Sequence, residues 1–253
     1  MILALLASVG ARAEPTLRVG TGDWPPYVDQ GRDDGGALGR LISAVFAQAG
    51  YRVEYVFNPW KRNLLMLRKG ELDAVMPYAC SEARQAYSLC SAPLVYGDVV
   101  LFRSKGADFD WQRIEDLAAY RIGTTLGYSY GPQFDEKRGQ GLFNIQESAK
   151  SETALRLLLH GRIDIHPQDR AVGYALLQRQ FSAAERALID HHPRSLNRES
   201  LHLLFRSGDA QAAELHRRFN QGLQALARNG ELQRLQKALY EGKVDAWAPR
   251  SEP

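Results

Sequence analysis

Two stretches of the chain, LRKGELDAV at residues 67–75 and LLHGRIDIH at residues 158–166, follow one pattern. Each reads as the end of a helix, a glycine, a polar residue, an aliphatic residue and an aspartate that opens an apolar run. The two glycines, Gly70 and Gly161, lie about 90 residues apart, which is too far for a solenoid repeat. The same helix-to-strand joint therefore occurs twice, and we expect each copy to belong to a separate αβ unit.

The residues around the first joint predict a β-α-β-α-β unit. Alternating residues over 16–21 indicate a strand, which must end before Pro25 and Pro26 because proline cannot donate to a sheet ladder. Helix and strand patterns then alternate over four segments: residues 40–50, 51–58, 60–70 and 72–79. This order within about sixty residues is typical of a mainly parallel sheet with right-handed crossovers.

The same alternation restarts near residue 120. Strand patterns occur at residues 120–127, 144–149, 162–167 and 195–208, and helix patterns at residues 128–139, 152–161, 170–180, 209–230 and 231–242. In open α/β sheets, ligands bind just beyond the carboxyl ends of the strands. Two such sheets that face each other would place the residues after Val75 and His166 on either side of a cleft.

The composition is that of a soluble globular protein with room for two domains. Of the 253 residues, 45% are hydrophobic and 24% are charged, and the net charge of +3 comes from scattered basic residues. This distribution does not favour nucleic acid as a partner. After the N-terminal run, no segment approaches the roughly 18 uninterrupted apolar residues of a membrane span.

The N-terminal run MILALLASVG, followed by Ala11-Arg12-Ala13, resembles the apolar core and cleavage site of a secretory signal peptide. We expect residues 1–13 to be a signal peptide and the mature chain to be exported to the periplasm. The basic residues that usually open such a peptide are missing, so a start codon upstream of Met1 is one interpretation. A buried first helix is the alternative interpretation.

Cys80 and Cys90 are the two cysteines of the chain. In an exported protein, an even number of cysteines with short spacing favours one disulfide. Closing a loop of this size would stabilise the fold by about 2–3 kcal/mol. Two small buried thiols are the alternative. We expect no metal site, because no histidine lies near the cysteines.

Six motifs, in order along the chain, carry a resemblance to a known family: DWPPY at 23–27, GRLISAVFAQAG at 39–50, LRKGELDAV at 67–75, SEAR with SAP at 81–93, IGTTLGYS at 122–129 and HGRIDIHPQD at 160–169. Residues 17–240 resemble bacterial periplasmic solute-binding proteins of family 3, the polar amino acid-binding type used by ABC importers. The resemblance implies a two-lobed α/β fold of the type II periplasmic binding protein kind, with mainly parallel sheets flanked by helices and two hinge crossings.

The resemblance also implies the division of the chain. It places the hinges near residues 95–98 and 196–200. Lobe 1 would then comprise residues 14–97 and 199–253, and lobe 2 would comprise residues 98–198.

Four ligand contacts follow from the resemblance. Arg84 matches an arginine whose guanidinium holds a ligand carboxylate through two parallel hydrogen bonds. Asp169 matches an aspartate that accepts the ligand's α-ammonium, and Trp24 matches a stacking aromatic, with Tyr27 beside it. The alternatives are a solvated Arg84, a helix N-cap role for Asp169 and packing of the two aromatic residues at the lobe edge.

A glycine turn supplies further candidates. Gly127, Tyr128 and Ser129 match a family turn at a helix start, where unpaired backbone N–H groups attract an anion. Tyr128 replaces the hydroxyl residue that usually contacts the carboxylate, so the backbone carries the expected role. Asp73 and Asp164, in the repeated joints, are expected to be buried structural carboxylates that bind local N–H groups.

The remaining candidates surround the first joint and Arg84. Ser81 begins the same motif, and Tyr78 and Ala79 lie where amino acid binders often present serine or threonine. Ala79 cannot donate or accept through its side chain, which weakens the amino acid assignment. Trp60 and Arg62 begin the helix before this joint and are candidates for the cleft wall, although a core position is the commoner one for tryptophan.

We therefore expect a monomeric binding protein that uses no cofactor. It would capture a small carboxylate-bearing solute, an amino acid or a derivative, and pass it to the permease of an ABC importer. The alternative is an exported enzyme on the same scaffold, such as a cyclohexadienyl dehydratase-like lyase, with Glu82 and His166 as its general acid candidates. A third class is an interaction protein that binds no small molecule.

Overall fold

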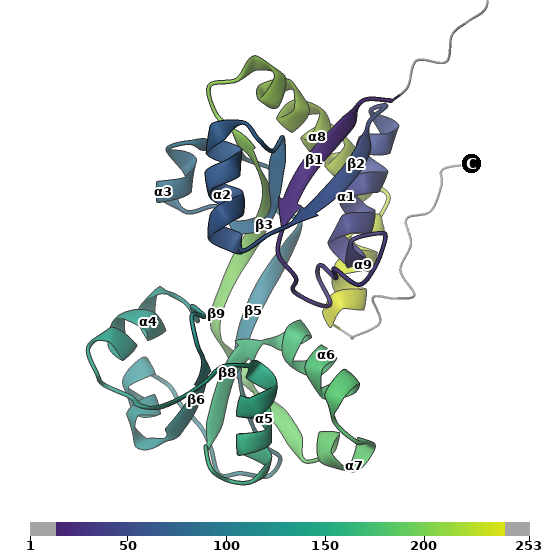
Figure 1. Cartoon of the computed structure of the whole chain (residues 1–253). Helices are drawn as coiled ribbons and strands as arrows, with labels where there is room; N and C mark the ends of the chain where they lie inside the picture. The colour runs from purple at the N-terminus through teal and green to yellow at the C-terminus, as the bar shows by residue number, and fades with distance from the viewer. Residues whose placement is uncertain (1–13, 241–253) are drawn as a thin grey trace, which may run out of the picture.

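The computed structural model describes residues 14–240, which form two lobes joined by two long strands, β5 (Val95–Ser104) and β9 (Ile189–Arg206) (Figure 1). The signal peptide expected at residues 1–13 and the end of the predicted lobe 1, residues 241–253, lie outside the described residues. No helix within residues 14–240 is both long and apolar enough to cross a membrane.

One lobe contains the elements before β5 and after β9. Its strands are β1 (Thr16–Thr21), β2 (Arg52–Phe57), β3 (Ala74–Ala79) and β4 (Ser88–Cys90), and its helices are α1 (Gly36–Gln48), α2 (Trp60–Lys69), α3 (Glu82–Gln85), α8 (Ala210–Arg228) and α9 (Glu231–Tyr240). Strand β1 pairs in parallel with β2 on one side and β3 on the other. The predicted β-α-β-α-β unit is therefore confirmed.

The other lobe lies between the two long strands in the sequence. It contains β6 (Arg121–Thr125), β7 (Asn144–Ser148), β8 (Ile165–Asp169), the 3-10 helix η1 (Ile114–Ala119), α4 (Pro132–Gly139), α5 (Ser151–Leu159), α6 (Arg170–Gln180) and α7 (Ala183–Arg186). Strand β6 pairs in parallel with β7 and β8. Each lobe thus has its own parallel core of three strands.

The long strands make the two parallel cores into one mixed sheet, in the order β2-β1-β3-β9-β5-β8-β6-β7. Strand β9 runs antiparallel to β3 and β5, and β5 runs antiparallel to β8. The predicted hinge segments pair with each other, with Tyr96 opposite Ser200 and Asp98 opposite Arg198. The two-lobed α/β fold with two crossings is confirmed, and the residue numbers of the lobe boundaries stay predictions.

The repeated joint has the same structure in both lobes. Gly70 follows α2 directly and Gly161 comes one residue after the C-cap of α5, with φ angles of 74° and 63°, a region that glycine enters without steric strain. The Asp73 carboxylate accepts the N–H of Arg18 at 2.7 Å, and the Asp73 N–H donates to the Arg18 carbonyl at 3.0 Å. The joint aspartate therefore fixes the start of the neighbouring strand β1.

Asp164 makes the same exchange with Arg121 of β6, at 2.8 Å in both directions, and adds an ion pair with its guanidinium at 2.6 Å. The expected structural role of Asp73 and Asp164 is confirmed. Both are partly exposed rather than buried, because each lies at the edge where its strand begins.

A glycine in each central strand lets the aliphatic residue of the joint pass over it. A Cβ atom on Gly20 of β1 would lie 2.4 Å from Cδ1 of Leu72, and a Cβ atom on Gly123 of β6 would lie 2.2 Å from Cδ1 of Ile163. Both distances are far inside van der Waals contact, so neither position accepts a side chain without displacement of the core.

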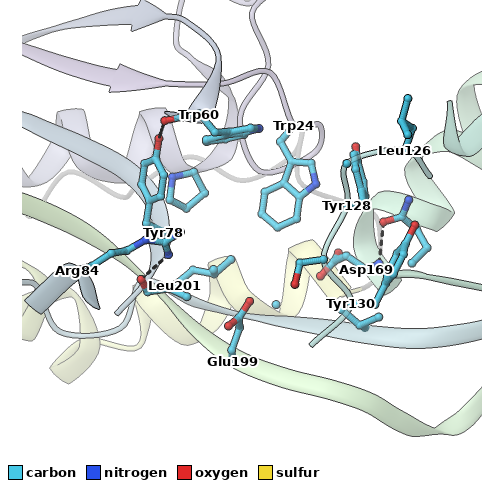
Figure 2. A pocket seen from close by; sticks show the side chains of 17 residues that line it. Trp24, Trp60, Tyr78, Arg84, Leu126, Tyr128, Tyr130, Asp169, Glu199 and Leu201 are labelled. Atoms are coloured by element: carbon cyan, nitrogen blue, oxygen red, sulfur yellow. Dashed lines mark hydrogen bonds between the residues drawn. The ribbon is translucent and has the colours of Figure 1, made fainter. Parts of the chain in front are cut away.

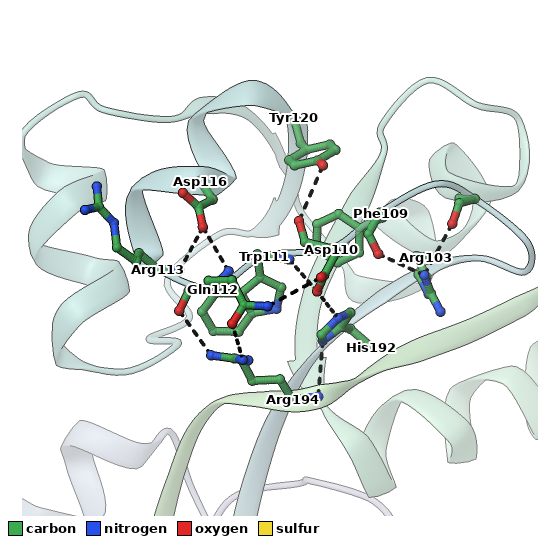
Figure 3. Close-up of polar contacts among 11 residues, drawn as sticks. Arg103, Phe109, Asp110, Trp111, Gln112, Arg113, Asp116, Tyr120, His192 and Arg194 are labelled. Atoms are coloured by element: carbon green, nitrogen blue, oxygen red, sulfur yellow. Dashed lines mark hydrogen bonds and ion pairs between the residues drawn. The ribbon is translucent and has the colours of Figure 1, made fainter.

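The connection between β5 and β6 is fastened to the far end of β9 (Figure 3). Nε2 of His192 lies 3.0 Å from the Asp110 carboxylate, and Nδ1 of His192 accepts the N–H of Arg194 at 3.1 Å. The Arg194 guanidinium donates to the Gln112 carbonyl at 3.1 Å and lies over the Trp111 ring. These contacts attach the connection to the part of β9 that lies in the second lobe.

We predict that Gly123→Ala lowers the free energy of unfolding by about 1–3 kcal/mol, because the added methyl group overlaps Ile163. The midpoint of urea unfolding measures the loss. Gly139→Ala is the control, since a Cβ atom there has open space around it. Adding Ile163→Val, which removes Cδ1, should recover part of the loss. Equal midpoints for Gly123→Ala and the wild type would contradict the overlap.

Candidate functional site between the lobes

A pocket of about 380 Å³ opens between the two lobes (Figure 2). Its walls come from both lobes and its base from the two long strands. The lining residues are Trp24, Trp60, Pro77, Tyr78, Ala79, Arg84, Gly97, Val99, Leu126, Gly127, Tyr128, Ser129, Tyr130, Gln168, Asp169, Glu199 and Leu201.

The walls lie at the carboxyl ends of the parallel strands, as expected. Trp24 follows β1, Ala79 ends β3, Asp169 ends β8 and residues 126–130 follow β6. The repeated joints start β3 and β8 in the two lobes, so both strands end at the same crevice.

Arg84 reaches the pocket wall from α3 and is held there by the protein. Its guanidinium donates to the Ala79 carbonyl at 2.7 Å, and its Cζ atom lies 5.2 Å from the centre of the Tyr78 ring. A guanidinium has five N–H donors, so most of them stay available to a ligand. Within the described residues, no carboxylate lies within 4.0 Å of this guanidinium.

Trp60 and Tyr78 form an aromatic wall beside Arg84. Their rings meet edge to face at 5.6 Å, and the Tyr78 hydroxyl donates to the Trp60 carbonyl at 2.9 Å. Burial raises the pKa of Tyr78 above its ordinary value, so the phenol stays neutral. A Cβ atom on Gly22 would lie 2.5 Å from the Trp60 ring, so the glycine makes room for the indole.

Trp24 lines the pocket and stacks on Tyr27, with ring centres 4.4 Å apart and planes inclined by 23°. Tyr27 is 1% exposed and does not line the pocket. Its hydroxyl instead lies 3.2 Å from both carboxylate oxygens of Asp169, across the boundary between the lobes. The structure therefore puts Tyr27 behind Trp24, where it contacts Asp169 and not the open pocket.

Asp169 is the N-cap of α6, as the alternative interpretation of the sequence predicted. Its carboxylate accepts the N–H of Val172 at 3.1 Å and the N–H of Asp98, in β5, at 2.9 Å. The residue is 4% exposed. Burial raises the pKa of Asp169 to about 6, although the backbone N–H groups of Asp98 and Val172 and the Tyr27 hydroxyl all favour the charged form.

Gly127, Tyr128 and Ser129 line the pocket, but their turn is not the start of a helix. Helix α4 begins at Pro132, because proline is preorganised for the first helical position and its missing N–H leaves no donor unpaired there. The N–H of Tyr128 donates to the Thr125 carbonyl at 3.1 Å. The expectation that this turn begins a helix is therefore wrong. The expectation of a free backbone amide is wrong for Tyr128.

The backbone amides on either side of Tyr128 are free within the part of the chain that the structure describes. Among residues 14–240, no group accepts a hydrogen bond from the N–H of Gly127 or the N–H of Ser129. The Ser129 hydroxyl donates to the Asp135 carboxylate, which also accepts the N–H of Tyr130 at 3.2 Å. Two amides of the turn therefore stay available to an anion.

Besides Tyr27, four sequence candidates do not line the pocket. Ser81, Arg62 and Glu82 are exposed outside it, at the starts of α3 and α2. His166 lies three residues before the end of β8 and is 0% exposed, with Nδ1 2.8 Å from the Gly123 carbonyl. Burial lowers the pKa of His166 to about 4, so the ring is neutral near pH 7. Neither proposed general acid, Glu82 or His166, reaches the pocket.

Cys80 and Cys90 form a disulfide, as the sequence favoured. The bridge closes the loop that contains α3 and Arg84. In the part of the chain that the structure describes, no three His, Cys, Asp or Glu side chains are grouped so that they could hold a metal ion.

Sequence reasoning missed several residues of the pocket, and four of them show why. Gln168 precedes Asp169 at the end of β8, and the strand-end rule could have found it. Leu126 and Tyr130 flank the glycine turn that was predicted. Glu199 comes from β9, and only the antiparallel pairing of β9 with β5 brings it to the pocket.

The raised pKa of Asp169 predicts the sign of a pH effect. Its folded-state pKa of about 6 lies above the ordinary value of 3.8 for an aspartate, so its contribution to stability is fully present below about pH 4 and is lost as pH rises through 6. The stability of the wild type relative to Asp169→Asn should therefore fall between pH 4 and 7, by an amount on the order of 2–3 kcal/mol. Urea unfolding at several pH values measures it, and a difference that grows with pH would contradict the assignment.

Solved structures with the same fold cover nearly the whole chain. A histidine kinase sensor domain with similarity to periplasmic binding proteins aligns with TM-score 0.70 and 22% identity, over 90% of this chain and 97% of that one. An ancestral arginine-binding protein bound to arginine aligns with TM-score 0.69 and 21% identity, over 90% and 100%. The ancestral amino acid-binding protein described as a precursor of cyclohexadienyl dehydratase aligns with TM-score 0.66 and 22% identity, over 89% and 95%.

No curated protein sequence matches the chain. A family model does match, and it spans residues 17–241, which include every residue of the pocket. The order of the motifs, the two lobes and the interlobe pocket all agree with that match. The chain belongs to the bacterial extracellular solute-binding proteins, family 3.

Proposed function

We propose that the protein, after export to the periplasm, captures a small carboxylate-bearing solute, an amino acid or a derivative, and delivers it to an ABC importer. The observation that carries the proposal is Arg84, a positioned guanidinium in an interlobe pocket that has no carboxylate partner among residues 14–240. Two parallel hydrogen bonds from a guanidinium match the geometry of a ligand carboxylate.

The opposite wall provides a second set of donors. Gly127 and Ser129, whose amides have no acceptor within the described residues, line the pocket from the second lobe, so a carboxylate held by Arg84 would gain further partners there when the lobes approach each other. We propose that residues 14–97 with 199–253 and residues 98–198 move as two units about β5 and β9. Closure would bury the ligand and present a new outer surface to the permease.

The size and lining of the pocket agree with an amino acid. Trp24, Trp60, Tyr78 and Tyr128 provide flat apolar walls for a side group, and a volume of about 380 Å³ lies within the range typical of small-molecule sites. The similar structures described as amino acid-binding proteins support the same ligand class. The chain would act as a monomer, since one copy supplies both walls.

We predict that Arg84→Ala weakens binding by roughly 30-fold or more, because loss of a desolvated charge partner costs about 2 kcal/mol or more. Thermal unfolding against the standard amino acids and small organic acids measures the effect, since a ligand at a hundredfold excess over Kd stabilises by about 2.7 kcal/mol. Arg62→Ala is the matched control, an exposed arginine outside the pocket. An unchanged Kd for Arg84→Ala would rule out its role, and no stabilisation by any compound would reject the proposed function.

The lyase alternative receives a direct test, because a similar structure is described as a precursor of cyclohexadienyl dehydratase. Its two general acid candidates from the sequence lie outside the pocket, so we predict no turnover of prephenate or arogenate. Chromatography of each compound after incubation with purified protein measures this. Loss of either compound above the uncatalysed rate would favour the lyase.

A further inference from the structure

Asp169 is occupied by contacts within the protein. One carboxylate oxygen accepts the N–H of Val172 and the other accepts the N–H of Asp98, while the Tyr27 hydroxyl lies 3.2 Å from both. A carboxylate has about four lone-pair sites, so most of this capacity is used. With 4% exposure, little of the side chain remains to receive a ligand.

The Glu199 carboxylate, unlike that of Asp169, is not occupied by contacts within residues 14–240. Glu199 lies opposite Gly97 in the β5–β9 pair, and a Cβ atom on this glycine would lie 3.5 Å from Leu201 and 3.7 Å from the Asp169 carboxylate, so Gly97 adds no side chain to the base of the pocket. Its side chain is exposed to the pocket, and within residues 14–240 it has no hydrogen bond or ion pair. Figure 2 shows its carboxylate rising from β9 into the pocket, between Arg84 on one side and Asp169 on the other.

We infer that Glu199, and not Asp169, is the carboxylate that receives the ligand's cationic group, so that a zwitterion lies between Glu199 and Arg84 on the base of the pocket. The inference rests on the proposed function. It states which residue of the same site receives the positive group of the ligand and which receives the negative group. Asp169 then has a structural role, as the residue that joins α6, β5 and the loop after β1.

The electrostatics of the pocket agree with this assignment. The pKa of Glu199 is raised because the surrounding protein removes water from it, and the nearby Arg84 offsets only part of that effect. Arg84 is therefore close enough to act on Glu199, yet the two groups lie more than 4.0 Å apart and form no ion pair. A ligand with one positive and one negative group would neutralise both.

The aromatic residues add to the preference for a cation near Glu199. Trp24 stands over the same part of the pocket in Figure 2, and a tryptophan face attracts a cation. A simple organic acid would satisfy Arg84 but leave the Glu199 carboxylate desolvated and unpaired. The site should therefore prefer an amino acid to the same molecule without its amino group.

The test compares amino acids with their deaminated analogues: L-phenylalanine with hydrocinnamate, L-leucine with isocaproate, L-glutamine with glutaramate and L-arginine with guanidinovalerate. Kd values are measured by calorimetry for the wild type, Glu199→Gln and Asp169→Asn. Glu54→Gln, an exposed glutamate of β2, is the matched control. Thermal unfolding without ligand shows whether each variant is folded.

For the pair that binds the wild type, Glu199→Gln should weaken the amino acid about tenfold or more and leave the analogue within about threefold, because only a charged hydrogen bond to the amine is lost. Asp169→Asn should weaken both members by similar factors. An amine-selective loss in Asp169→Asn with none in Glu199→Gln would overturn the inference, as would equal losses of both members in Glu199→Gln. If no amino acid binds the wild type, the proposed function itself fails.

Discussion

The buried carboxylate of Asp169 holds three parts of the molecule together, and the shape of the pocket depends on it. It caps α6 of the second lobe, binds the Asp98 N–H of the long strand β5 and meets the Tyr27 hydroxyl of the first lobe. The ion pair between Asp29 and Arg179, at 2.8 Å, crosses the same boundary. Ala171 and Val172 of α6 also pack into the hydrophobic core of the first lobe. Where α6 meets the first lobe, the relative position of the two lobes is thus set by contacts within the protein.

The repeated joint explains why two lobes with different sequences meet at one crevice. In each lobe, a left-handed glycine turns the chain from a helix into a strand, and an aspartate fixes the register of that strand against its neighbour. Because the same local geometry starts both β3 and β8, both strands deliver their last residues to the pocket. The joint has a structural role, and through it the joint determines which residues line the pocket.

The sequence predicted the parts of the fold that local patterns control. The alternation of helices and strands, the two αβ units and the favoured disulfide follow from periodicity, turn residues and cysteine spacing. The pocket residues Trp24, Tyr78, Arg84 and Asp169 were predicted from the resemblance to the family, and Trp60 from its place at the start of the helix before the first joint. The first part of β9, residues 189–194, was not predicted, because these residues lack an alternating pattern and become a strand through pairing with β5. Glu199 lies inside the strand predicted at residues 195–208, but it was missed as a pocket residue because only the pairing of β9 with β5 brings it there. Packing of Tyr27 was the alternative interpretation of the sequence, but its contact with Asp169 was missed because it joins the two lobes.

The disulfide bears on binding as well as on folding. Cys80 and Cys90 bracket the short segment that presents Arg84, so the crosslink restricts that segment before any solute arrives. Ordering a loop and a long side chain normally opposes association. Here the crosslink restricts the segment once the chain has folded and oxidised, so a ligand bound by Arg84, as proposed above, would have less of the protein to order. Under that proposal, the redox state of the compartment would influence the affinity.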